Sequence, residues 1–172
     1  MNFVIKEAEA ADAESIANIH FESLRKSYAG KLPQEYLDMP VTEWRINAWK
    51  KWIARSKVRT LVAKEKEHNI GFCTLQPFND ESNKKETAEI VALFALPEKW
   101  RRGIGEDLCK QIEATARKAG FADIALWVLK SNENAQNFYL AQGYHLQEGD
   151  RIFLETANEP LLEVMYRKSL VQ

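Results

Sequence analysis

Residues 96–106, which read LPEKWRRGIGE, decide how the chain is interpreted. They begin on the last of seven consecutive apolar residues, 90–96, and lead into a segment whose aliphatic residues recur about one helical turn apart. We therefore predict a doubly buried strand, a glycine-bearing turn and then a helix over 103–119. Gly120 stands where a helix commonly ends in the left-handed conformation.

The predicted turn has the chemistry of an anion site. Free N–H groups and the dipole at a helix start attract negative charge. Gly103 and Gly105 have no Cβ, so a phosphate can approach their backbone closely, and Arg101 and Arg102 add positive charge. The alternative is a glycine turn beside a solvated basic face. The segment is not a Walker loop, because no Gly-Lys-Ser/Thr follows, and it lacks the context of a dinucleotide fingerprint.

Periodicity and turn residues outline the other elements. A turn over 65–69 predicts a hairpin, and 79–86 and the region around 158–160 are expected to be loops. We expect helices from Asp12 to Gly30, from Thr42 to Ile53 and over 135–143, and strands at 2–8, 58–64, 70–78, 88–96, 124–129, 144–147 and 162–167.

The predicted order is β-α-α-β-β-β-α-β-α-β-β. A strand, a helix and a second strand in the middle imply a right-handed parallel crossover, whereas the flanking hairpins imply antiparallel pairing. The fold class is therefore α/β with a mixed sheet and helices on both faces. At 172 residues, the chain is expected to form a single domain over 1–172 that buries about 70% of its surface.

Composition narrows the function classes. A net charge of −1 disfavours a broad basic surface for nucleic acid. The longest apolar run is far below the roughly 20 residues of a membrane span, and residues 1–6 do not resemble a signal peptide. Cys73 and Cys109 are too few for a disulfide framework, so we expect free thiols and a cytoplasmic location. The three histidines have no metal-ligand spacing, so no metal is expected.

A second motif changes the interpretation. Residues 132–144 read NENAQNFYLAQGY. Together with 96–106, this segment resembles the GNAT superfamily of N-acetyltransferases, whose members carry an acyl-CoA pyrophosphate loop (Gln/Arg-x-x-Gly-x-Gly/Ala) and an Asn-x-x-Ala-x-x-Phe-Tyr-x-x-x-Gly-Phe/Tyr signature. The order of elements matches as well, so the resemblance covers nearly the whole chain. One position departs: Trp100 stands where the family usually has Gln or Arg.

The resemblance implies acetyl-CoA as co-substrate. It would lie where the strand ending at Leu96 diverges from the strand at 124–129. Phe94, Ala95 and Leu96 are the expected cofactor-binding residues of this strand: the pantetheine arm would pair with its backbone near Phe94 and Ala95, and its N–H groups would polarise the thioester carbonyl. The Asn132 side chain would bond a pantetheine amide, or serve as a helix N-cap. The pyrophosphate would be held by backbone N–H groups of Arg101, Arg102, Gly103, Ile104, Gly105 and Glu106.

The resemblance also implies two catalytic side chains. Tyr139 matches the family's general acid, which would protonate the leaving thiolate; the alternative is a core aromatic. Glu89 is the candidate general base, acting through water; the alternative is a surface carboxylate. Trp127 occupies a position where a subfamily that acetylates ribosomal-protein N-termini has a glutamate, which argues against that substrate class.

The first two helices and their connection would form the acceptor pocket. Aromatic and acidic side chains there suit a cationic amine, although a tryptophan stripe at helical spacing is more often core. None of the three histidines is expected to be catalytic: His20 lies on a packed stripe, His68 in a turn and His145 in an edge-like strand. The pocket residues are Tyr28, Tyr36, Trp44, Trp49, Trp52, Glu22, Glu35 and Asp38.

We therefore expect direct acetyl transfer from acetyl-CoA to the primary amine of a small molecule, such as a polyamine, an amino acid derivative or an aminoglycoside, rather than to a protein N-terminus. One alternative is a non-catalytic acyl-CoA-binding module. A second is a toxin-like transferase acting on aminoacyl-tRNA, which the near-neutral charge disfavours. A homodimer is an expectation from the family alone.

Overall fold

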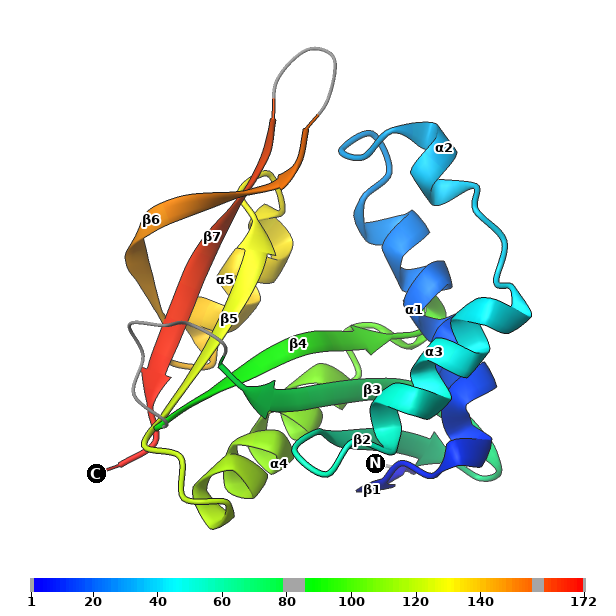
Figure 1. Ribbon diagram of the computed structural model, residues 1–172, viewed down its shortest axis with the longest axis horizontal. Helices are drawn as coiled ribbons and strands as arrows, with labels where there is room; N and C mark the ends of the chain where they lie inside the picture. The colour runs from blue at the N-terminus through cyan, green and yellow to red at the C-terminus, as the bar shows by residue number, and fades with distance from the viewer. Residues whose placement is uncertain (1, 79–85, 156–159, 172) are drawn as a thin grey trace.

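The computed structural model describes residues 2–78, 86–155 and 160–171, and within these ranges seven strands form one mixed sheet (Figure 1). The strand order is β1-β2-β3-β4-β5-β7-β6. All neighbouring pairs are antiparallel except β4 and β5, which are parallel. The strands are β1 (Val4–Glu7), β2 (Arg59–Glu65), β3 (His68–Pro77), β4 (Thr87–Ala95), β5 (Asp123–Leu129), β6 (His145–Leu154) and β7 (Leu161–Ser169).

Helices cover both faces of the sheet, as expected (Figure 1). On one face, α4 (Ile104–Lys118) and α5 (Glu133–Ala141) pack on apolar residues of β2 to β5 and β7. On the other face, α1 (Ala13–Ser27) and α3 (Glu43–Ile53) pack on β2, β3 and β4. Three short helices, η1 (Ala10–Asp12), α2 (Gln34–Leu37) and η2 (Pro97–Lys99), complete the described elements.

Two central strands separate at the middle of the sheet. The parallel pairing of β4 with β5 runs only from Thr87 and Asp123 to Ile90 and Leu126. At that point the register between β3 and β4 shifts at Thr74, which leaves Val91 as an extra residue on β4. Such a bulge bends a strand and increases its twist. Beyond it, β4 and β5 diverge (Figure 1), so the last residues of β4 have a strand on one side only.

The predicted fold class and the expected element order are confirmed, with local corrections. The first helix ends at Ser27 rather than at Gly30, and α2 was not predicted. Asp12 and Thr42 precede their helices, but neither side chain caps them. Instead the Asp12 carboxylate accepts from the Glu9 N–H and from Asn69, across 57 positions of sequence.

Strand ends differ from the expectation in two places. The hairpin turn between β2 and β3 consists of only two residues, because Lys66 adopts a left-handed conformation with φ 54°. His68 therefore begins a strand instead of lying in a turn. β6 runs on to Leu154, well past the expected end at 147. The loops expected over 79–86 and around 158–160 lie almost entirely outside the described residues.

Candidate active site

Six consecutive amide groups are left without a partner at the start of α4. The main-chain N–H groups of residues 101–106 donate to no other described residue. The helix begins at Gly103, whose φ of 80° is left-handed, and Arg101 also has a positive φ of 58°. Alternation of left-handed and right-handed residues turns successive N–H groups toward one point and makes an anion-binding concavity. These unpartnered amides lie on the residues for which the motif predicts a phosphate site.

The charges around this concavity are not equivalent. Glu65 on β2 receives a hydrogen bond of 2.5 Å from Lys99 and one of 3.3 Å from Arg102. The bond from Lys99 holds the pKa of Glu65 below its ordinary value. Arg102 is thus partly compensated. Arg101, in contrast, has no ion-pair partner within the described part of the chain, so its charge is available to a ligand.

The direction of the main chain in β4 follows from its register. The Leu96 N–H donates to the Ile70 carbonyl at 2.9 Å. Antiparallel pairs alternate between bonded and non-bonded positions, so the backbone groups of Phe94 point to β3, and those of Leu93 and Ala95 point the other way. The Phe94 carbonyl indeed lies against Gly71 of β3. Leu93 and Ala95 therefore face the side from which β5 has diverged.

This register corrects two expected contacts, at Phe94 and Leu96, and adds one. Phe94 was expected to pair with the pantetheine arm through its backbone, but β3 already uses those groups. Leu93, which the sequence did not single out, has backbone groups on the open edge together with Ala95. Leu96 was also expected to contact the cofactor, but its N–H donates to the Ile70 carbonyl of β3. The residue that faces an open edge depends on the register of the neighbouring strand, which no local pattern of β4 reveals.

A glycine of β3 brings α4 close to this edge. A Cβ on Gly71 would lie 2.9 Å from the Ile104 side chain and 3.1 Å from the Phe94 carbonyl. Only glycine lets the first turn of α4 sit this close to β3. Gly71 was also missed from the sequence, although a glycine inside a strand is a signal for close backbone approach.

Tyr139 lies on α5 and is 8% exposed, packed by its ring against Phe138 and Tyr144. Its hydroxyl forms no hydrogen bond to a described residue, yet it is not among the fully enclosed polar atoms. Burial raises the pKa of Tyr139 well above its ordinary value, and the nearby Cys73 and Cys109 add to the shift. The phenol therefore stays protonated at neutral pH and is available as a donor. The packing expected of a core aromatic is present as well.

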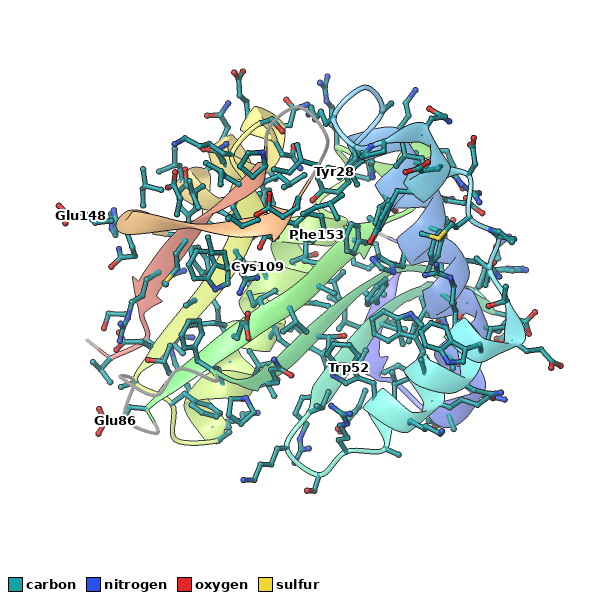
Figure 2. The ribbon with its side chains drawn as sticks, turned by 45° about the horizontal axis from the view of Figure 1, so that its top comes forward. Tyr28, Trp52, Glu86, Cys109, Glu148 and Phe153 are labelled. Carbon is teal, nitrogen blue, oxygen red and sulfur yellow. The ribbon has the colours of Figure 1, made fainter. Side chains whose placement is uncertain are left out.

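Asn132 begins α5 and is 6% exposed. Its Oδ1 accepts from the Ala135 N–H at 3.4 Å, so the alternative role as an N-cap is observed. Burial raises the pKa of Tyr28, and the Asn132 side chain opposes this with a smaller lowering effect. Tyr28 follows α1 and packs near Leu129 at the end of β5 (Figure 2). The α1–α2 connection thus reaches the signature segment.

Glu89 and Trp127 share the face of the sheet opposite α4. Their neighbours along the strands, Ile90 and Leu126, point into the core under α4, so alternation places Glu89 and Trp127 on the other side. The Glu89 carboxylate accepts from Gln76 Nε2 at 3.0 Å and is half-buried. The Arg151 guanidinium lies 4.3 Å from the centre of the Trp127 ring and is ion-paired with Glu163 at 2.7 Å.

The expected acceptor residues divide into core and surface. Trp49 is 9% exposed and packs on Phe72, with Trp52 stacked on it, so this part of the stripe belongs to the core. Trp44 is 73% exposed, and Glu22, Glu35, Tyr36 and Asp38 are exposed too. His20 lies on the packed stripe, as expected, with its ring 4.8 Å from that of Phe94. Burial, aided by Arg45, lowers the pKa of His20 to about 4.

The cysteines are poor nucleophiles. Both Cys73 and Cys109 are free and buried. Burial raises the pKa of Cys109 to about 12 and that of Cys73 well above its ordinary value. Because the thiolate is the reactive form, neither thiol is suited to accept an acyl group at neutral pH. Within the described ranges, no cluster of His, Cys, Asp and Glu could hold a metal ion, and no helix could span a bilayer.

A mixed sheet whose central parallel strands splay apart, with unpartnered amides (the predicted phosphate cradle) at the start of the helix after β4, is the arrangement expected of an acyl-CoA-dependent transferase. The sequence profile of the Acetyltransferase (GNAT) family matches residues 18–144, well over half of the chain. The chain therefore belongs to the Acetyltransferase (GNAT) family. The expected enzyme class, an acetyl-CoA-dependent acyltransferase, is confirmed.

Similar proteins agree with this assignment. An uncharacterised N-acetyltransferase, YuaI, of Bacillus subtilis is 28% identical over 130 residues, which cover 74% of this chain and 72% of YuaI. A spermidine N(1)-acetyltransferase of Thermoplasma acidophilum is 24% identical over 156 residues, 87% of this chain and 92% of that protein. The crystal structure of the PaiA N-acetyltransferase of T. acidophilum with coenzyme A has a TM-score of 0.75 at 23% identity, covering 98% and 99% of the two chains.

Proposed function

We propose that this protein transfers the acetyl group of acetyl-CoA to the primary amine of a small molecule. The observation that carries the proposal is the pairing of two backbone features: six unpartnered amides at 101–106 and an open strand edge at Leu93 and Ala95. The first suits a diphosphate and the second suits an extended amide-bearing arm. Acetyl-CoA carries both groups, one after the other.

Each step of the proposed acetyl transfer is assigned to particular residues of this chain. A new bond forms between the acceptor nitrogen and the acetyl carbon, and the carbon–sulfur bond breaks. N–H groups on the open edge of β4 stabilise the thioester carbonyl oxygen, which becomes negative in the tetrahedral intermediate. Tyr139 gives its proton to the leaving sulfur, and the proton of the attacking amine passes through water to Glu89. Asn132 contributes a hydrogen bond to the pantetheine arm in addition to its role as a cap.

The acceptor is proposed to approach from the face opposite α4. Glu89 and Trp127 both lie on this face, where Arg151 covers the Trp127 ring and pairs with Glu163 of β7. Glu89 has no ion-pair partner among the described residues, so its carboxylate is the group on this face that favours an amine. The 24% identical relative is named a spermidine N(1)-acetyltransferase, which supports including polyamines among the candidates. Trp127 at the position of a glutamate in the N-terminus-acetylating subfamily disfavours a protein N-terminus.

The deciding experiment measures thiol release from acetyl-CoA with a panel of amines: polyamines, amino acid derivatives, aminoglycosides and a peptide with a free N-terminus. We expect saturable thiol release and a mass increase of one acetyl group in at least one small amine. Acetyl-CoA binding without turnover on any amine would instead favour a non-catalytic acyl-CoA-binding module. Acetylation of aminoacyl-tRNA alone would favour the toxin-like alternative.

A further inference from the structure

The side chain of Arg151 reaches from the edge strand β6 across β7 to β5. Arg151 lies opposite Glu163 of β7 in the register of the sheet, and its Nε donates to the Glu163 carboxylate at 2.7 Å. Its guanidinium covers the ring of Trp127 on β5, 4.3 Å from the ring centre. From β6 to β5 is two strand spacings, or about 10 Å. A side chain of the outermost strand is thus directed inward, toward the strand at which the sheet splays.

Arg151 reaches the same face of the sheet as the candidate base Glu89. The Trp127 ring that it covers faces away from α4, as Glu89 does. Glu89 pairs with Ala125 of β5, and Trp127 follows two residues later, about 7 Å further along the strand. Trp127 is also the first residue of β5 beyond its pairing with β4. The guanidinium therefore lies on the proposed acceptor side, where the two strands have begun to diverge.

The guanidinium of Arg151 keeps donors for a ligand. Arg151 donates to described residues through Nε only, so neither of its Nη groups has a partner among them. These two groups carry all but one of the N–H donors of an arginine side chain. The side chain is 48% exposed, so a ligand can reach them from solution. Because the ring of Trp127 and the carboxylate of Glu163 already orient the fork, little freedom is lost when it binds.

The contact with Glu163 holds the fork without using it up. The Glu163 side chain is only 11% exposed, so its charge needs a cation beside it. A pair that served this need alone would gain from a bidentate contact, in which an Nη group also donates to the carboxylate. The observed contact is made through Nε alone. It compensates Glu163 and leaves the outer edge of the guanidinium free.

The charges on this face suit a ligand that carries both signs. Glu89 has no ion-pair partner among the described residues. Arg167 of β7 lies on this face too, because it pairs with Ala125, but its guanidinium is bonded to Asp123 at 2.8 Å. Arg151 is a cation with donors to spare. One uncommitted carboxylate and one uncommitted guanidinium fork match the ammonium and the carboxylate of a single small molecule.

We propose that Arg151 binds a carboxylate of the acceptor, which is therefore an amino acid or a similar amine with a carboxylate near it. This inference rests on the function proposed above and narrows its substrate class. The acceptor amine lies toward Glu89, and the carboxylate accepts two parallel hydrogen bonds from the Nη groups of Arg151. A polyamine would bring a further ammonium group toward this guanidinium, and like-charge repulsion disfavours it.

Matched pairs of acceptors test the carboxylate site: amino acids and their carboxamides, which differ in the charge of one group. The wild type should favour the acids by about tenfold or more in kcat/KM, the worth of a charge-assisted contact. Arg151→Gln should abolish this preference through a rise in KM. Arg151→Lys keeps the charge but loses the fork, so it should keep only part of the preference. Because each pair is compared in both enzymes, differences in amine basicity cancel.

Loss of recognition is separated from loss of stability by a double variant. Arg151→Gln leaves the buried Glu163 carboxylate without its cation and should lower the Tm. Adding Glu163→Gln should restore the Tm but not the preference for acids. A double variant that regains the preference would show that Arg151 only neutralises Glu163, and the proposal would be overturned.

The matched control for charge is Lys130→Gln. Lys130 pairs with Asp150 at 2.7 Å. Asp150 lies opposite Val164, whose side chain belongs to the core under α4, so this pair lies on the other face of the sheet. The variant removes one positive charge, as Arg151→Gln does, and it should keep the wild-type preference. An equal loss of preference in Lys130→Gln would reduce the effect of Arg151 to net charge and would overturn the site.

A binding measurement separates this inference from the proposed function, because it needs no turnover. N-acetyl amino acids and their uncharged amides are titrated into the protein with coenzyme A, and the indole N–H resonance of Trp127, assigned through Trp127→Phe, is followed. The acids should move this resonance saturably, the amides should not, and Arg151→Gln should abolish the effect. Equal shifts with acids and amides, or no shift with any acid, would overturn the carboxylate site even if other amines are acetylated. Selective shifts without acetyl transfer to any amine would support the site and refute the proposed function alone.

Discussion

The general-acid role proposed for Tyr139 depends on its hydroxyl group. The ring is packed like a core residue, but its hydroxyl has no partner among the described residues and is not fully enclosed. We predict that Tyr139→Phe lowers kcat by about 10²-fold, the usual worth of a general acid, and leaves acetyl-CoA affinity nearly unchanged. Thiol release at saturating acetyl-CoA measures the first quantity and calorimetry the second. An unchanged kcat would refute the acid role.

The same residue gives a prediction about pH. Burial raises the pKa of Tyr139 above its ordinary value near 10, so the phenol keeps its proton throughout the range in which amines become unprotonated. We therefore expect kcat to show no Tyr139-dependent fall between pH 7 and about pH 10. The wild-type pH profile divided by that of Tyr139→Phe isolates this contribution. A ratio that declines with a midpoint near pH 9 would contradict it.

His20 makes stability depend on pH. Its pKa is about 4 in the folded protein, against about 6.5 when unfolded. The unfolded chain therefore takes up the proton first, and stability is full above pH 6.5 and is lost as the pH falls toward 4. The loss should approach about 3 kcal/mol at the lower limit. Urea unfolding at pH 7, 5.5 and 4.5 should show a smaller decline for His20→Gln than for the wild type. Parallel declines would mean that His20 is not the group responsible.

At the scale of single elements, the start of α4 contains two glycines with different requirements. Gly103 has a left-handed φ of 80°, so Gly103→Ala should cost about 1–2 kcal/mol and turn the cradle amides away from the diphosphate. Gly105 is helical, and a Cβ there would lie 3.5 Å from the Phe138 ring, an ordinary contact. Gly105→Ala is therefore the matched control, and it should be neutral or gain up to about 1 kcal/mol.

Chemical denaturation and acetyl-CoA titration of both glycine variants measure these effects. Gly103→Ala should weaken acetyl-CoA binding more than Gly105→Ala does, because only the change at Gly103 also alters the backbone conformation of the segment. Equal losses in the two variants would show that the cradle depends on space rather than on the backbone conformation at Gly103.

The elements show what sequence reasoning can and cannot reach. α4 was predictable because its aliphatic repeat, its left-handed start at Gly103 and its end at Gly120 are all local signals. β6 was predicted too short because it lies at the sheet edge and is exposed on nearly every residue, which leaves no alternating pattern to find. α2 has only four residues, too few for a helical period.

In the candidate site, too, some residues could be predicted from the sequence and others could not. The glycines, arginines and Tyr139 were predictable because the motifs fix them by spacing. The hydrogen bond from the Ser23 hydroxyl to the Ala95 carbonyl was not, because the two residues are 72 positions apart and only packing brings them together. The backbone of Leu93, and not that of Phe94, faces the open edge because of the register between β4 and β3. Register is a property of the pair of strands and cannot be predicted from either strand alone.

For the whole molecule, ligand binding should appear as global stabilisation. The proposed site draws on α1, β4, α4 and α5, so acetyl-CoA binds the folded state and not the unfolded chain. At 100 times its Kd it should add about 2.7 kcal/mol. For a chain of this size, that corresponds to about 5–11 °C in Tm. NADH is the control, because it carries a diphosphate and an adenosine but no pantetheine arm to occupy the open edge of β4. An equal Tm shift with NADH would show that the site recognises only the diphosphate and does not bind the pantetheine arm. The absence of a shift with any CoA ester would mean that Trp100 has closed the edge to the arm, and the proposed transfer would be lost with it.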